Sequence, residues 1–85
     1  MSVFEELIDE KLLKILTLFM HNKEQQFHLQ KISQETNIPI STVFRIIRKL
    51  TNLDLIDFTT IGKLKIYRIA QNDKTRELDV YLKDA

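Results

Sequence analysis

Apolar residues recur every three or four positions through the first quarter of the chain, which is the spacing of one face of an α-helix. The pattern predicts a helix over residues 3–21, opened either by a capping box between Ser2 and Glu5 or, after a short lead-in, by Asp9 as N-cap. A second apolar stripe lies on the same helix, made of Leu13, Leu16 and Met20. This is more apolar surface than one small core requires, so we expect the second stripe to be exposed.

The next segment predicts a short helix followed by a sharp turn. The run "LQKISQET", residues 29–36, has helical spacing, and we expect His28 to cap it or to face water. Asn37 tolerates the left-handed backbone that ends many helices, and Pro39 disfavours helical geometry in the residue before it. A third helix should then begin with Ser41 as its N-cap.

The third predicted helix, residues 41–52, has two chemically different sides. At about 100° per residue, one arc collects the apolar side chains and the opposite side collects polar and basic ones. The apolar set is Val43, Ile46, Ile47 and Leu50, and the polar and basic set is Thr42, Arg45, Arg48 and Lys49. Phe44 lies between the two sides. One side should therefore pack against the core while the other presents positive charge.

After Leu53 the helical period gives way to alternation. Residues 55–70 predict a two-stranded hairpin with its tip within residues 60–63, at the only glycine of the chain, and Phe58 and Tyr67 are expected to be core residues. Residues 72–85 predict a short last helix, capped by Asn72 or Asp73. One side of that helix carries Leu78, Tyr81 and Leu82.

Length and composition limit what else the chain can hold. Its 85 residues are expected to form one domain, residues 1–85, with one modest core. The chain has no cysteine, and His21 and His28 alone cannot complete a zinc site, so we expect no metal and no other cofactor. We find no nucleophile–base pair and no phosphate-binding glycine loop, and therefore predict no enzyme activity. The acidic start and the lack of a long apolar run predict a cytoplasmic protein without a membrane partner.

The net charge of +1 conceals a marked segregation. Residues 1–22 have a net charge of −2, whereas residues 41–68 have a net charge of +4. A surface that binds a polyanion shows such asymmetry, although a basic face that is simply solvated would show it too.

The order of these elements resembles a winged helix-turn-helix domain, a mainly α fold with a small β-hairpin. The run "LQKISQETNIPISTVFRIIRKLTNLDLIDF" is similar to the helix-turn-helix core of prokaryotic regulators of the MarR, IclR and TrmB kinds. The matching features are small Ser33, the turn, the capping serine and the apolar triplet Val43, Ile47 and Leu50. Asn37 and Asp54 replace glycines that are common in the family, and both tolerate left-handed backbone.

The resemblance implies a sequence-specific transcriptional regulator that binds double-stranded DNA, with residues 41–52 in the major groove and a wing, residues 55–70, on the backbone or minor groove. The expected DNA-binding residues are Ser41, Thr42, Phe44, Arg45, Arg48, Lys49, Lys63 and Lys65. Among them Arg45 is best placed for base edges, and Phe44 is expected to support the wing or second helix more than to contact a thymine methyl group.

We also expect a homodimer and no small-molecule ligand. The two apolar stripes on the first and last helices predict the dimer interface, formed by Leu13, Leu16, Met20, Leu78, Tyr81 and Leu82. An alternative function is a winged-helix protein interaction module without DNA specificity, which the mild net charge and the acidic first helix favour.

Overall fold

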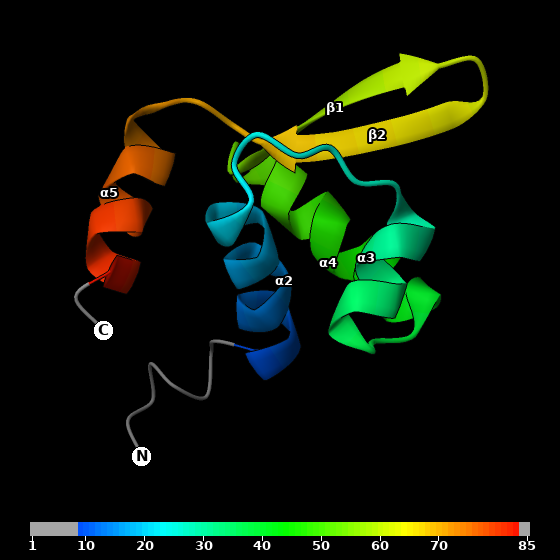
Figure 1. Cartoon of the computed structure of the whole chain (residues 1–85), viewed down its shortest axis with the longest axis horizontal. Coiled ribbons are helices and arrows are strands. Elements are labelled where there is room, and N and C mark those ends of the chain that lie inside the picture. The colour runs from blue at the N-terminus through cyan, green and yellow to red at the C-terminus, as the bar shows by residue number, and fades with distance from the viewer. Residues whose placement is uncertain (1–8, 84–85) are drawn as a thin grey trace.

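The computed structural model describes residues 9–83, and side chains through residue 80. Three helices pack together beneath an antiparallel hairpin, and a fourth helix lies at the opposite end of the molecule from the hairpin tip (Figure 1). In chain order the elements are α2 (Glu10–His21), α3 (Leu29–Thr36), α4 (Ile40–Asn52), β1 (Ile56–Ile61), β2 (Leu64–Ile69) and α5 (Asp73–Lys83). The mainly helical winged helix-turn-helix fold expected from the sequence is confirmed. None of the helices within residues 9–83 has the length and apolar content needed to cross a membrane.

Helix α2 begins after Asp9, whose side chain accepts a hydrogen bond from the Lys11 backbone N–H at 2.9 Å. The alternative start at a capping box on Ser2 lies outside the described residues. The expectation that Leu16 and Met20 are exposed is wrong, because only 4% and 5% of their surfaces are accessible. Helix α2 contacts α3, α4 and β2. These neighbours together cover more of the helix surface than a single apolar stripe. Leu13 alone of that second stripe is exposed, at 40%.

The turn between α3 and α4 has the predicted left-handed residue. Asn37 adopts φ 58° and ψ 36°, and its backbone N–H donates to the Ser33 carbonyl oxygen. The Ser33 hydroxyl in turn donates to the carbonyl oxygen of Ile38 at 2.5 Å. His28 caps α3 as expected, accepting a bond from the Lys31 N–H through Nδ1 at 3.2 Å. These short-range bonds fix the angle at which α4 leaves the turn.

The predicted N-cap of α4 is wrong by two residues. The helix begins at Ile40 with Pro39 as N-cap, and Ser41 lies inside its first turn. Pro39 has the extended geometry that its ring permits, and its carbonyl oxygen accepts bonds from Thr42 and Val43. The proline thus sets the helix start, which leaves the Ser41 hydroxyl available at the surface.

The hairpin, or wing, has the predicted tip at Gly62 and Lys63 and pairs Phe58 with Tyr67 and Thr60 with Lys65. On the inner face of the hairpin, side chains become less buried from the base toward the tip. Ile56 is buried at the base, whereas Phe58 is 46% exposed. The expectation that Phe58 is a core residue is therefore wrong, because the wing leaves the helices before this position. Tyr67 is buried, and its backbone exchanges two hydrogen bonds with Phe27, a bridge that the sequence did not predict.

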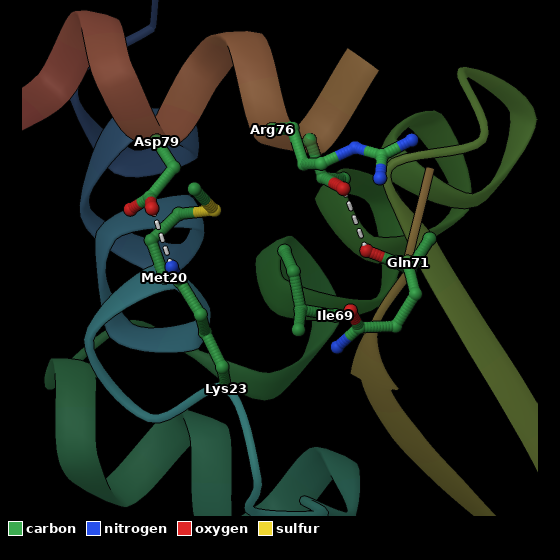
Figure 2. A pocket seen from close by; sticks show the side chains of 8 residues that line it. Met20, Lys23, Ile69, Gln71, Arg76 and Asp79 are labelled. Carbon is green, nitrogen blue, oxygen red and sulfur yellow. Dashed lines mark hydrogen bonds and ion pairs between the residues drawn. The ribbon is translucent and has the colours of Figure 1, made fainter. Parts of the chain in front are cut away.

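Helix α5 is held by polar contacts at its N-terminal half. Asn72 caps it, because Oδ1 accepts from the Thr75 N–H at 3.0 Å while the Thr75 Oγ1 accepts from the Asn72 N–H at 3.2 Å. The Thr75 hydroxyl also donates to the Ala70 carbonyl oxygen at 2.8 Å. Further along the helix, Asp79 pairs with Lys23 at 2.5 Å (Figure 2). Leu78 is half-buried against the core and not fully exposed, which corrects part of the apolar stripe predicted for the last helix. The side chains of Tyr81 and Leu82 lie outside the described residues.

The left-handed geometry of Asn37 predicts a specific stability effect. Asn37→Ala should unfold with a free energy about 1 kcal/mol lower than Asn37→Gly, because alanine is strained at positive φ and glycine is not. Asn52→Ala, at the exposed end of α4, is the control and should change stability little. Equal melting temperatures for the alanine and glycine variants at position 37 would contradict the left-handed turn.

Candidate nucleic-acid interface

The exposed side of α4 carries three basic side chains in two helical turns. Arg45, Arg48 and Lys49 are exposed, while the apolar side formed by Val43, Ile46, Ile47 and Leu50 is buried. Burial of that side against α3, α2 and β1 fixes the rotation of the helix. Ser41 is exposed and Thr42 is half-buried in the first turn of the same helix. The structure thus brings the predicted polar and basic residues of α4 onto one accessible surface.

No carboxylate in the described part of the chain forms an ion pair with these basic side chains. Among the described residues, the four ion pairs use Lys23, Lys31, Lys74 and Arg76, all from outside α4 and the wing. Arg45, Arg48, Lys49, Lys63 and Lys65 take part in none of them. Their positive charge therefore remains available to an anion.

The two lysines of the wing occupy different positions. Lys63 lies in the turn at the tip and is exposed. Lys65 lies on the inner face, since alternation places it on the side of Tyr67 and Phe58, and its Nζ lies 4.9 Å from the centroid of the Phe58 ring. One lysine therefore projects from the end of the wing, whereas the other lies beside the inner surface that faces α4.

A groove of about 340 Å³ separates α4 from the wing, and we call it the helix–wing groove. Its walls contain aromatic, basic and neutral polar side chains but no carboxylate. The lining residues are Phe44, Ile47, Arg48, Thr51, Asn52, Phe58, Lys65 and Tyr67. Burial raises the pKa of the Tyr67 phenol above its ordinary value, so this ring stays neutral at physiological pH.

Phe44 lies at the edge of this groove and of an adjoining hollow that reaches His28, Leu29 and Lys63. Its ring is 43% exposed, and the guanidinium carbon of Arg48 lies 5.8 Å from its centroid. The ring borders residues of α3 and the wing, as a supporting role requires, but nearly half of it remains accessible.

The fold brings to this surface several residues that the sequence pattern did not predict there. Phe58 was assigned to the core, and Thr51 and Asn52 at the end of α4 and Gln30 on α3 were not considered. Only the fold reveals them, because they reach the groove or the adjoining hollow from the ends or sides of three separate elements. In the described part of the chain, no cluster of three or more His, Cys, Asp or Glu side chains could hold a metal ion.

Comparison with known proteins identifies the family. The model of the IclR helix-turn-helix domain matches residues 10–59, more than half of the chain, so the chain belongs to this family. It is a winged helix-turn-helix DNA-binding domain of the kind found in transcriptional regulators. No curated protein sequence matches it significantly.

Solved structures support the fold over nearly the whole chain. A crystal structure from Archaeoglobus fulgidus is 26% identical, with a TM-score of 0.76 over 98% of this chain and 91% of the other. TubR from Bacillus thuringiensis, solved bound to 24 bp of tubC, is 24% identical, with a TM-score of 0.73 over 91% and 84% of the two chains. A homodimeric winged helix-turn-helix domain from Mycobacterium bovis, of a possible ArsR-family regulator, is 21% identical, with a TM-score of 0.71 over 95% and 71%.

The half-exposed position of Phe44 predicts a modest stability effect. Phe44→Ala should lower the free energy of unfolding by about 1 kcal/mol, since roughly half of the ring is buried. Phe19→Ala is the comparison, because Phe19 is fully buried and its loss should cost about 3 to 5 kcal/mol. Chemical denaturation measures both, and equal losses would show that Phe44 is a core residue.

Proposed function

We propose that this domain is a sequence-specific regulator that places α4 in the major groove of double-stranded DNA and the wing on the neighbouring backbone or minor groove. The observation that carries the proposal is the set of basic side chains on α4 and the wing that take part in none of the ion pairs among the described residues; two of them, Arg48 and Lys65, line one carboxylate-free groove. An α-helix fits the major groove, and a polyanion is attracted to a positive surface that is not internally neutralised. The solved complex of TubR with DNA supports DNA as the partner.

Arg45 is the proposed base-reading residue. It projects from the N-terminal half of α4, the part of a recognition helix that approaches base edges, and a guanidinium can donate two hydrogen bonds to guanine. Ser41 and Thr42 in the first turn add hydroxyl groups for bases or phosphates. Arg48 and Lys49 lie further along α4 and suit backbone phosphates.

The wing supplies backbone contacts at a second position. Lys63 is at the hairpin tip, where the strands have left the helical core and can reach across to the next segment of DNA (Figure 1). An ammonium group at the end of a flexible stem binds phosphate as a point charge and carries no base specificity.

A homodimer is the proposed assembly, through α2 and α5. Leu13 is 40% exposed and borders a hollow with Glu10, Lys14 and Thr17, and Val80 on α5 is 63% exposed. A second copy would cover these apolar side chains, and the Mycobacterium bovis domain of the same fold is homodimeric. Two recognition helices would then read half-sites about 34 Å apart, or a multiple of that distance. Cytoplasmic location, the absence of an effector ligand and the absence of enzyme activity remain predictions.

Base reading and backbone binding can be separated by two substitutions. Arg45→Ala should weaken binding to the preferred duplex by about 1 to 3 kcal/mol and flatten the preference at one base pair in each half-site. Lys63→Ala should weaken all duplexes alike and reduce the slope of log affinity against log salt by about 0.9. Selection from a random duplex pool at two salt concentrations, followed by binding titrations, measures both effects.

The same titrations test the alternative function. If wild-type protein binds no duplex even at low salt, or if the two variants behave identically on specific and random DNA, α4 is a docking surface for a protein partner instead. Arg76→Ala, on α5 and outside the residues that line the helix–wing groove, is the charge-matched control and should leave DNA binding unchanged.

Dimerisation through α2 predicts that Leu13→Glu shifts the chain toward monomer, because the substitution places a charge in the apolar contact. Light scattering of wild-type protein should give about twice the mass of the 85-residue chain. Ile61→Glu, at an apolar residue of the wing tip that is 59% exposed, is the control and should leave the mass unchanged. A wild-type monomer at tens of micromolar would contradict the dimer.

A further inference from the structure

We infer that the helix–wing groove holds one stretch of DNA backbone between Arg48 of α4 and Lys65 of the wing, and that Phe44 and Phe58 position these two cations. The inference rests on the proposed function and adds to it a defined phosphate site shared by two elements. In that site the phenylalanines are positioning residues that act through the cations.

The charge of the lining favours an anion as the occupant. Arg48 and Lys65 reach the groove from opposite walls, and neither wall contains a carboxylate. Two hollows elsewhere on the described chain contain carboxylates: one is bordered by Glu24 and Asp57, and the other by Asp79. The helix–wing groove is thus electrostatically distinct from these concavities.

Each cation lies over an aromatic ring. Arg48 is 5.8 Å from the centroid of Phe44, and Lys65 is 4.9 Å from that of Phe58, both within the range of about 6 Å for cation–π attraction. A ring holds a cation without neutralising it, whereas a carboxylate would cancel its charge. The two side chains therefore lose part of their rotamer freedom before DNA arrives, which lowers the entropic cost of binding.

The remaining lining suits a phosphodiester strand. Asn52 offers a neutral amide donor of the kind that commonly binds phosphate oxygens, whereas the Thr51 hydroxyl already donates to the Ile47 carbonyl oxygen at 2.8 Å. Ile47 and Tyr67, which are both buried, line the groove between the two cations. The exposure of Phe44 and Phe58, at 43% and 46%, leaves both rings open to the groove rather than buried in the core.

The first test is a double-mutant cycle between Phe58 and Lys65, with duplex binding measured at two salt concentrations. Phe58→Leu should weaken binding about three- to tenfold while Phe58→Tyr, which keeps the ring, should bind as wild type. Lys65→Ala should weaken binding and reduce the salt slope by about 0.9. In the Lys65→Ala background, Phe58→Leu should have no further effect, a result that a merely structural role of Phe58 would not give.

The second test leaves both rings intact and asks whether Arg48 and Lys65 share a site. The losses from Arg48→Ala and Lys65→Ala should not add, because removing either cation releases the strand from the groove. Lys49→Ala is the matched control: Lys49 is an exposed cation on α4 that does not line the groove, so its loss should add to that of Lys65→Ala.

The outcomes distinguish this inference from the proposed function. Wild-type protein that binds no duplex at low salt overturns both. If wild-type protein binds DNA but the losses from Arg48→Ala and Lys65→Ala add as those of the Lys49 control do, the shared site is wrong and DNA binding stands. If Phe58→Leu weakens binding equally with and without Lys65, the ring supports the wing and does not position the cation.

Discussion

Burial of one side of α4 is the constraint on which the rest of the structure depends. Val43, Ile46, Ile47 and Leu50 are almost inaccessible, and they pack against α2, α3 and the base of the wing. Rotating the helix by one residue, about 100°, would expose part of this apolar side and bury arginine. The free-energy cost of burying that charge is far larger than the gain from any single surface contact. Core packing alone therefore decides that Arg45, Arg48 and Lys49 face outward.

The two ends of α4 are fixed by backbone geometry that only a few residue types accept. Asn37 before the helix and Asp54 after it both adopt positive φ, at 58° and 61°. Asp54 also joins α4 to α5, because its carbonyl oxygen accepts a bond from the Asn72 amide at 2.8 Å and its carboxylate lies 3.7 Å from Lys74. These contacts link the end of α4 to α5, the helix that we propose takes part in the dimer interface.

Sequence patterns predicted elements well where one local signal dominated. Helical spacing, the left-handed tolerance of Asn37 and the single glycine placed α3, the turn and the wing tip, and the basic side of α4 followed from its periodicity alone. The helix start at Pro39 was missed because two N-terminal signals lay close together, and the rigid proline prevailed over the capping preference of Ser41.

Depth within the fold was the quantity that periodicity could not supply. Alternation placed Phe58 on the correct face of the wing but could not tell how far the hairpin extends beyond its helices. The same limitation made Leu16 and Met20 seem surplus, because the number of neighbours that surround α2 is a tertiary property. Both errors concern residues whose apolar character was read correctly and whose partners were not.

These errors in depth also explain why the groove beside α4 was not predicted. A phenylalanine in a small domain is expected to contribute most by burial, yet Phe44 and Phe58 each leave more than two fifths of their surface accessible. Each ring instead has a cation over it, on the surface where the chain concentrates its positive charge. The core beneath these two rings is buried without them. Their exposure is therefore consistent with a surface that binds a partner.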